Sequence, residues 1–388
     1  MKSNWPSYSS EEAYEVLKII KSNKVNYWTG QQGKKFEIEF SRYFKLKYSV
    51  AIANASLGLE CALKALEIKK NDEVIVPSKS YVSSASCVVN VNAKPVFCDI
   101  DLNSQNITPE FIKKKISKKT KAIICVHLGG YPCDMPKILD ICKKKNIKII
   151  EDCSQAHGAK IGKSYVGSFG DISVWSFCND KIISTLGEGG MIGTNNQKLF
   201  ERIWQLKEIG KIRRLMIKNY KNNLYRYVHG SFGTNLRLTE TQSAVGRIQL
   251  KKLKNFVKIR NLNSKKIMNC LKNFKSVKVQ IIPKNITHAF YRCYIQINNR
   301  YLKKGWSRNK IIEKLIRADV RCNEGSCSEL YRERSFIKFG FKPKKRLQNA
   351  SKLSKSSIAF QVDHTISFKK LQKMIIYINK IFLKATKL

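Results

Sequence analysis

The chain has 388 residues and a formal charge of +46 at pH 7, because 74 Lys and Arg outnumber 28 Asp and Glu. Hydrophobic residues make up 43% of it, which excludes an intrinsically disordered protein and supplies enough apolar surface for two domains. The lysines are scattered from end to end without a nucleic-acid-binding motif, so we interpret the charge as a solvated surface and expect no nucleic-acid partner.

The cysteines, apolar runs and histidines indicate where in the cell the protein is expected and whether a membrane segment or a metal site is expected. The 12 cysteines are dispersed, the closest two being Cys322 and Cys327, so we expect reduced thiols and a cytoplasmic protein. No stretch reaches the roughly 18 apolar residues of a membrane helix, so no membrane insertion is expected. The five histidines never pair at the spacing of metal ligands, so we expect no metal site.

In chain order, two helices come first and alternating strands and helices follow. Ser9 and Glu12 predict a capping box ahead of an amphipathic helix, and a second helix is expected near residues 36–44. Short apolar, β-branched runs then predict buried strands at residues 48–53, 74–77, 95–99, 122–126 and 147–151. Strands that alternate with helices predict a mainly parallel sheet.

The strict alternation ends near residue 251, where a second domain is expected to begin. We therefore place a large domain at residues 1–250 and a smaller α+β domain at residues 251–388. A long basic connecting helix is predicted at residues 252–263. The chain closes with an apolar stripe at helical spacing, interpreted as packing, that consists of Phe368, Leu371, Met374, Ile375, Ile378 and Phe382.

Four loops are candidates for one ligand site, because open parallel sheets bind ligands beyond the carboxyl ends of their strands. Ser56 opens a helix whose amides could hold a phosphate, although such residues also cap helices without a ligand. Asp152 ends a strand and could hold a ring nitrogen protonated or make a structural salt bridge. Lys181 follows another strand, whereas residues 231–242 indicate only a polar loop before a helix.

Taken together, these loops resemble the DegT/DnrJ/EryC1/StrS family of sugar aminotransferases over nearly the whole chain. Further segments carry the same resemblance, at residues 27–30, 72–78, 94–101, 120–124, 126–130 and 166–171. It implies the type I pyridoxal-phosphate aminotransferase fold, an α/β fold with a mainly parallel seven-stranded sheet flanked by helices and a smaller C-terminal α+β domain. It also implies a homodimer with shared active sites, with pyridoxal 5′-phosphate as the cofactor and pyridoxamine phosphate as its intermediate form.

The resemblance implies a role for each matching residue. Lys181 would be the catalytic lysine that binds the cofactor covalently, and Asp152 would keep the ring nitrogen protonated. Gln155 would lie beside the ring hydroxyl, and Tyr81 would stack on the ring. The phosphate would be held by Ser56, the Leu57 amide, Ser176 and, from the other subunit, Asn235.

The activity implied is transfer of an amino group from glutamate to a nucleotide-linked keto sugar, with a 4-keto-6-deoxyhexose favoured, for a surface polysaccharide such as an O-antigen. Lys181 is retained where some relatives that remove a sugar hydroxyl have histidine, which favours transfer. We expect desolvation in the pocket to lower the pKa of Lys181 so that it reacts at neutral pH. Sugar contacts are expected, by position alone, from Tyr227, His229, Arg237 and Tyr331.

The sequence departs from the family at two points and leaves three alternatives open. Ala55 and Ser56 replace the usual Gly-Thr of the phosphate turn, and residues 178–180 replace the commoner His-Pro-x before the lysine. The alternatives are a pyridoxal enzyme of the same fold with other chemistry, such as a sugar 3-dehydratase, a non-catalytic regulator, and a nucleic-acid-binding protein. A glutamate half-reaction that forms pyridoxamine phosphate would separate the first from the main prediction.

Overall fold

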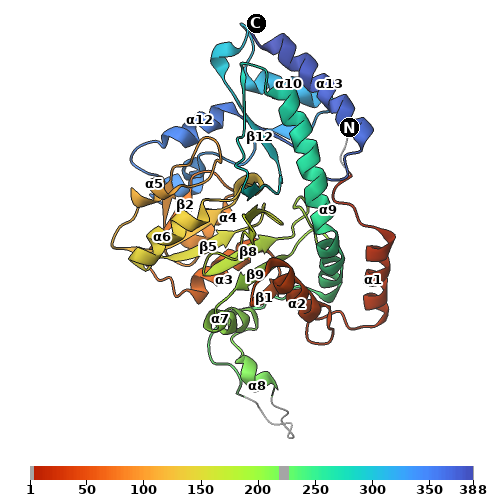
Figure 1. Ribbon diagram of the computed structural model, residues 1–388. Coiled ribbons are helices and arrows are strands. Elements are labelled where there is room, and N and C mark those ends of the chain that lie inside the picture. The colour runs from red at the N-terminus through yellow and green to blue at the C-terminus, as the bar shows by residue number, and fades with distance from the viewer. Residues whose placement is uncertain (1–3, 218–226, 388) are drawn as a thin grey trace.

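A seven-stranded sheet lies at the centre of the protein (Figure 1), whose computed structural model describes residues 4–217 and 227–387. The strands lie in the order β1-β9-β8-β5-β4-β2-β3. Their bounds are β1 Tyr48–Ile52, β2 Glu73–Pro77, β3 Lys94–Cys98, β4 Thr120–Val126, β5 Lys148–Asp152, β8 Ile172–Ser176 and β9 Gly190–Thr194. The first five agree with the strands predicted from apolar runs to within two residues at each end, and the predicted α/β class is confirmed.

Six of the seven strands run in one direction, and β9 runs against them. Strands β8, β5, β4, β2 and β3 pair in parallel, whereas β9 pairs antiparallel with both β8 and β1. Strand β1 therefore runs parallel to β8 across β9, and the carboxyl ends of all six strands lie at one edge of the sheet. Residues 177–189 connect β8 to β9 as a hairpin does, without a helical crossover.

Helices cover both faces of this sheet, because successive strand residues point to opposite faces. Val74 and Val76 of β2 face the core beneath α3, α4 and α7. Ile75 lies on the opposite face above α5 and α6, and Trp175 of β8 lies on that face against the phenylalanines of α2. The bounds of these helices are α2 Gln32–Phe44, α3 Ala55–Ala65, α4 Ser83–Asn90, α5 Pro109–Lys113, α6 Met135–Lys145 and α7 Gln197–Lys207.

The predicted N-terminal helices are confirmed, but the helix after the sheet is longer than expected. Helix α1 (Ser10–Lys21) begins with the predicted capping box, and α2 contains the predicted residues 36–44. Helix α9 (Glu240–Leu271) is one unbroken helix in place of the separate segments predicted on either side of residue 251. Because α9 crosses the proposed domain boundary without a break, the division between residues 250 and 251 stays a prediction.

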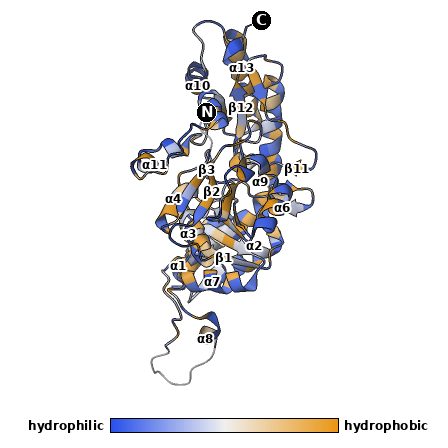
Figure 2. Ribbon diagram, turned by 90° about the vertical axis from the view of Figure 1, so that its left-hand side faces the viewer, coloured by the Kyte–Doolittle hydropathy of each residue, from blue (hydrophilic) through white to orange (hydrophobic). Residues whose placement is uncertain are grey.

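A second core lies beyond α9, around an antiparallel sheet in the order β10-β12-β14-β13. Leu371, Met374, Ile378 and Phe382 of α13 are buried in it, which confirms that the closing stripe is packing; only Phe368 of that stripe is strongly exposed. Figure 2 shows orange and blue residues interspersed along α13, as in an amphipathic helix. The bounds are β10 Val277–Val279, β12 Cys293–Ile297, β13 Cys322–Asn323, β14 Ser357–Phe360, α10 Arg308–Arg317, α12 Gln348–Ser356 and α13 Phe368–Ala385.

The remaining elements are short. Strands β6 (Lys160–Ile161), β7 (Ser164–Tyr165) and β11 (Ile286–Thr287) form a small separate sheet. Helix α11 (Arg334–Lys338) lies near the second core's loops, and α8 (Arg213–Ile217) projects away from the large sheet (Figure 1).

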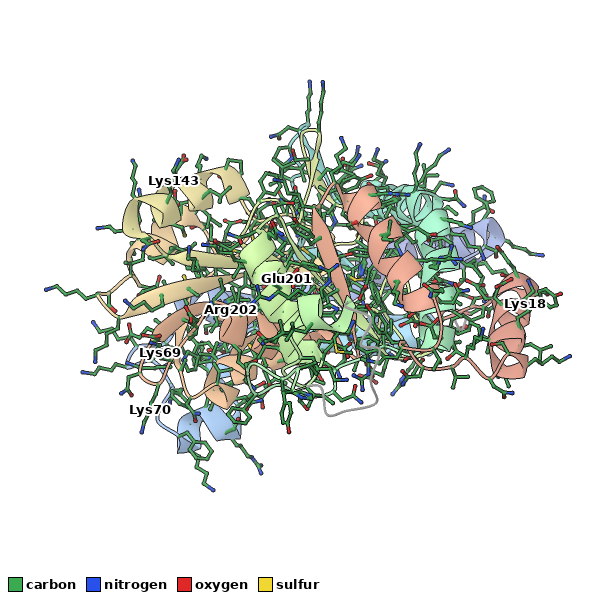
Figure 3. All side chains as sticks on the ribbon, turned by 90° about the horizontal axis from the view of Figure 1, so that it is seen from below. Lys18, Lys69, Lys70, Lys143, Glu201 and Arg202 are labelled. Carbon is green, nitrogen blue, oxygen red and sulfur yellow. The ribbon has the colours of Figure 1, made fainter. Side chains whose placement is uncertain are left out.

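The surface carries the lysines on several sides. Figure 3 shows Lys18 far from Lys69 and Lys143, which come from three different helices or loops. All 12 cysteines are free thiols, as predicted. Within the described part of the chain, no helix combines the length and the apolar character needed to cross a membrane.

Candidate active site

The carboxyl ends of β1, β8 and β5 bring the predicted cofactor-binding residues to one edge of the sheet. Ser176 of β8 pairs with Gly190, which pairs on its other side with Ile52 of β1. Asp152, the last residue of β5, pairs with Val174, two residues before Ser176. This register gathers the predicted phosphate ligands and the predicted partner of the ring nitrogen within three neighbouring strands and the start of β9.

Helix α3 begins at this edge with the geometry of an anion site. The Leu57 amide, predicted to hold the phosphate, donates to the capping residue Asn54 at 3.0 Å in this structure, so its phosphate role stays a prediction; the helix dipole adds positive charge at this end. A Cβ on Gly190 would lie only 2.9 Å from the carbonyl carbon of Asn54, so β9 can start this close only with glycine. Ser56 in the first turn and Ser176 at the end of β8 each add a hydroxyl.

Asp152 is buried and its carboxylate keeps positions for another partner. Its Oδ2 accepts from the Ser84 hydroxyl at 3.1 Å, and its Oδ1 accepts from the Ser154 amide at 3.1 Å. The Ser84 hydroxyl lies 2.8 Å from that of Ser80. Since a carboxylate offers about four acceptor positions, these two bonds orient Asp152 and leave room for a proton on a ring nitrogen.

Lys181 lies in the connection between β8 and β9 among charged and aromatic neighbours. Its Nζ is 3.3 Å from Asp180 Oδ1 and 5.0 Å from the centre of the Tyr291 ring. Asp180 also accepts hydrogen bonds from the Tyr291 hydroxyl and, at 3.3 Å, from Arg292. Burial acts to lower the pKa of Lys181, but Tyr291 and Asp180 outweigh it, so this pKa is raised. The predicted lowering of the Lys181 pKa is wrong, because burial, although the largest single effect, is outweighed by Tyr291 and Asp180 together.

The N-terminal segment holds the Lys181 connection from outside, a contact that the sequence did not reveal. The Trp5 indole N–H donates to the Lys181 carbonyl at 2.8 Å, and the Tyr8 hydroxyl lies 3.1 Å from Ser184 Oγ. Trp5 is buried and its ring meets that of His364 edge to face. The two partners of the first bond are 176 residues apart, so no local pattern signals it.

Glu151, directly before Asp152, is a buried anchor that sequence reasoning also missed. Its carboxylate lies 3.0 Å from His127 Nε2 and accepts from three backbone amides, those of Gly167, Phe169 and Gly170. The loop after β7 is thereby tied to the end of β5. The sequence signal for such an anchor is a predicted buried strand that ends in two consecutive acids, because only one of them can serve the site at the edge.

His127, Glu151 and Cys153 form a group of three possible metal ligands in the described residues. The second ring nitrogen of His127 accepts from the Cys133 amide at 3.0 Å, and backbone amides already occupy Glu151. His127 and Glu151 therefore already have hydrogen-bond partners within the protein. Because Glu151 directly precedes Asp152, we interpret these bonds as fixing the end of β5.

Two other predicted cofactor neighbours lie at suitable positions. Tyr81 follows β2 at the same edge and is 65% exposed, so its ring is available for stacking. Gln155 is buried, and its Oε1 accepts from the Gly129 amide at 2.7 Å. The amide hydrogens of Gln155 consequently remain as the group that can meet a ring hydroxyl.

The segment predicted to reach the other subunit is exposed in the single chain. Asn235 and His229 lie on the surface, Phe232 is 100% exposed, and Tyr227 is 88% exposed beside the projecting α8. The segment returns to the sheet at Leu236, whose carbonyl accepts from the Ala53 amide at 2.8 Å. The segment thus joins the sheet close to the helix start that is predicted to hold the phosphate.

Two predicted sugar contacts are engaged within the chain. Arg237 donates to the fully buried Glu208 at 2.6 Å. Tyr331 is fully buried, its hydroxyl donates to Glu329 at 2.6 Å, and it accepts from the Leu347 amide at 3.2 Å. These contacts favour a packing role for Tyr331 and leave its substrate role, like that of Arg237, a prediction.

The residues at this edge fit pyridoxal 5′-phosphate. The capped start of α3 with two serine hydroxyls suits a phosphate ester, and the carboxylate of Asp152 suits a protonated pyridine nitrogen. The Lys181 amine, on the connection directly after β8, suits an aldehyde.

Comparison with known proteins gives the same family. The sequence profile described as the DegT/DnrJ/EryC1/StrS aminotransferase family matches residues 6–379. The chain is 34% identical over 317 residues to GDP-perosamine synthase of Escherichia coli O157:H7, covering 80% of this chain and 81% of that protein. It is 33% identical over 329 residues to dTDP-3-amino-3,6-dideoxy-alpha-D-galactopyranose transaminase of Aneurinibacillus thermoaerophilus, covering 85% and 86% of the two chains.

A solved structure extends the agreement to the fold. The X-ray structure of the aminotransferase from Psychrobacter cryohalolentis is 41% identical to this chain, with a TM-score of 0.95 over 98% of both chains. The predicted family, fold and cofactor are confirmed. This chain therefore belongs to the DegT/DnrJ/EryC1/StrS aminotransferase family.

Proposed function

We propose that this chain transfers an amino group from glutamate to a nucleotide-linked keto sugar, with a 4-keto-6-deoxyhexose as the favoured acceptor. The observation that carries the proposal is the placement of Asp152 at the end of β5 and of Lys181 on the connection that leaves the adjacent strand β8, at the edge of the sheet where a helix start suited to a phosphate also lies. Relatives named for GDP-linked and dTDP-linked amino sugars support the acceptor class. A relative named as a spore coat polysaccharide biosynthesis protein supports a role in supplying a surface polysaccharide, and we propose that the protein acts in the cytoplasm.

The chemistry divides between cofactor and protein. Pyridoxal phosphate supplies an aldehyde that binds amines and a protonated ring that accepts an electron pair. Asp152 holds the proton on the ring nitrogen, with Ser84 and Ser154 fixing its carboxylate. Lys181 would move a proton from the α-carbon of the amino donor to the C4′ carbon of the cofactor and, in the second half-reaction, from that carbon to the former carbonyl carbon of the sugar, as a general base and acid.

The environment of Lys181 sets a condition on this role. Asp180 and Tyr291 raise the pKa of its amine, so the lysine holds its proton until a reacting partner takes the place of that charge interaction. Asp180 is then the group that orients the amine, because Arg292 and Tyr291 fix the other carboxylate oxygen.

The half-reactions test the proposed function directly. Purified enzyme loaded with pyridoxal phosphate is mixed with glutamate, and the conversion to pyridoxamine phosphate is followed by absorbance. The loaded enzyme is then offered GDP-, dTDP- and UDP-linked 3-keto and 4-keto sugars, and the amino sugar is identified by mass spectrometry. Conversion with glutamate and one keto sugar supports the proposal. Loss of a sugar hydroxyl without transfer of nitrogen would establish the dehydratase instead.

We also propose a homodimer in which Asn235 completes the phosphate site of the partner. The exposure of Asn235, Phe232 and Tyr227 in the single chain supports it. The test mixes Lys181→Ala subunits with Asn235→Ala subunits, each poorly active alone. Shared sites return about a quarter of the sites to the intact state after random exchange, because half the dimers are mixed and each has one intact site. No recovery of activity would show that Asn235 acts within its own chain.

A further inference from the structure

Lys79, two residues after β2, is a buried lysine that the proposed reaction does not use. Its side chain is fully buried, and its Nζ donates to Ser328 Oγ at 2.9 Å and to Ser357 Oγ at 3.1 Å. It also lies 5.2 Å from the centre of the Tyr294 ring. Among the described residues no carboxylate oxygen lies within 4.0 Å of this amine. Burial of an amine without a carboxylate partner is costly, so a structural or functional role is needed to explain Lys79 at this place.

The groups that face Lys79 come from four elements and include no compensating acid. Arg308, at the start of α10, donates to the Ser357 carbonyl at 3.1 Å and opposes the charge, whereas the Cys327 thiol favours it. Glu329, next to Ser328, is held by Arg346 at 2.7 Å and is therefore turned to another partner. Burial, with Arg308 adding to it, lowers the pKa of Lys79 to about 7.

Lys79 stands at the joint between the large sheet and the second core. Ser78 and Ser80 on either side of it pair with the loop before α11: the Leu330 amide donates to Ser78 at 2.9 Å, and the Ser80 amide donates to Cys327 at 3.2 Å. The Lys79 amine also donates to the hydroxyl of Ser357, the first residue of β14. It thereby ties the segment after β2 to two separate segments of the second core.

The same segment leads directly to the candidate active site. The Ser80 hydroxyl lies 2.8 Å from that of Ser84, and Ser84 donates to Asp152 at 3.1 Å. Tyr81, predicted to stack on the cofactor ring, lies between these two serines in the chain. A shift of the segment would therefore change both the bond to Asp152 and the position of the Tyr81 ring.

We propose that Lys79 is a positioning residue that fixes the segment at residues 78–84 against the second core and thereby sets the Ser84–Asp152 hydrogen bond and the place of Tyr81. The inference rests on the proposed roles of Asp152 and Tyr81 in cofactor binding. An amine suits this position, because a neutral amine still has two hydrogens for the two serines and the link survives loss of the charge. An apolar side chain of equal length would fill the space without making either bond.

The test compares Lys79→Met with Lys70→Met, a matched change at an exposed lysine. The apo proteins are titrated with pyridoxal phosphate by fluorescence quenching, and the absorbance of the loaded proteins is recorded from pH 6 to pH 10. We expect Lys79→Met to bind the cofactor about tenfold more weakly and to shift the pH midpoint of its absorbance, since Asp152 loses its orientation. Lys70→Met should match the unchanged protein in both measurements.

A second variant keeps the test decisive if Lys79→Met folds poorly. The double change Ser328→Ala and Ser357→Ala retains the lysine but removes both acceptors, and it should reproduce the weaker binding and the shifted midpoint. Unchanged cofactor affinity and an unchanged absorbance profile in these variants would overturn the positioning role. Both measurements need only the cofactor, so a failure of the proposed sugar transfer would leave them readable.

Discussion

Two loops at the same edge of the sheet each carry a lysine with little access to water, Lys79 fully buried and Lys181 partly buried, and the pKa values of the two amines shift in opposite directions. After β8, Lys181 meets Asp180 at 3.3 Å, and its pKa is raised despite burial. After β2, Lys79 meets only serine hydroxyls and an aromatic ring, and burial lowers its pKa to about 7. The difference shows that the immediate partners, and not depth alone, decide whether a buried amine keeps its proton.

The largest effect should come from the loop after β8. Lys181→Ala removes the amine that binds the cofactor and moves the proton, so we expect amino transfer to fall by about 10³-fold or more. The absorbance band of the covalently bound cofactor should disappear while the circular dichroism spectrum is kept. Lys70→Met serves as the control. Turnover close to that of the unchanged enzyme would end the assignment of Lys181.

The next largest effect should come from Asp152 at the end of β5. Asp152→Asn keeps the shape but loses the negative charge that holds the ring nitrogen protonated, so we expect about 10²-fold or more slower turnover. The rate of the glutamate half-reaction, measured in single-turnover absorbance experiments, checks this. Asp152→Glu should recover part of the rate. An unaffected half-reaction in the Asn variant would remove Asp152 from the mechanism.

The lowered pKa of Lys79 should make the stability of the protein depend on pH. Folded Lys79 releases its proton near pH 7, whereas the unfolded chain holds that proton up to about pH 10.5, so unfolding binds protons in this window. The stability contributed at this residue is lowest below pH 7 and rises as the pH increases toward 10.

Thermal unfolding at a series of pH values measures that contribution. The melting temperature of the unchanged protein should rise relative to that of Lys79→Met by about 1 °C between pH 7 and pH 8 and by more toward pH 10. Groups elsewhere in the chain titrate equally in both proteins and cancel. A constant difference between the two proteins across this range would show that Lys79 keeps an ordinary pKa.

The smallest effect should come from the N-terminal support of the loop after β8. Trp5→Phe keeps the ring packing on His364 but removes the N–H that donates to the Lys181 carbonyl at 2.8 Å. We expect turnover to fall by about three- to tenfold, the equivalent of one hydrogen bond, with little change in the Michaelis constant for the proposed sugar acceptor. A larger loss in the Michaelis constant than in turnover would contradict a role confined to Lys181.

Sequence reasoning reached the parts of the molecule that local patterns encode. The strands β1 to β5 were predictable because each is a short apolar run, and Asp152 was predictable at the end of β5 for the same reason; the reversed strand β9, which begins with glycine, was not predicted. Lys181 was found through its place after a strand and the family resemblance, and its position on the β8–β9 connection agrees with that prediction.

Contacts between distant segments could not be read in this way. Lys79 is one of many lysines in the sequence, and its burial depends on Ser328 and Ser357, about 250 and 280 residues further along the chain. The burial of Tyr331 depends equally on Glu329 and Leu347, which a guess by position could not foresee. The pKa of Lys181 was predicted with the wrong sign because desolvation was considered without Asp180 as a charge partner.

The reversed direction of β9 has a mechanical consequence. Because β9 returns antiparallel beside β8, the excursion that carries Lys181 leaves the sheet at Ser176 and re-enters at Gly190, and these two residues are paired. Both ends of the excursion are therefore held by the sheet, one of them on β8, the direct neighbour of the strand that ends in Asp152. Under the proposed function, we expect the movements that admit or release a bulky sugar to come from other loops, because the two ends of this excursion cannot separate without breaking the pairing between β8 and β9.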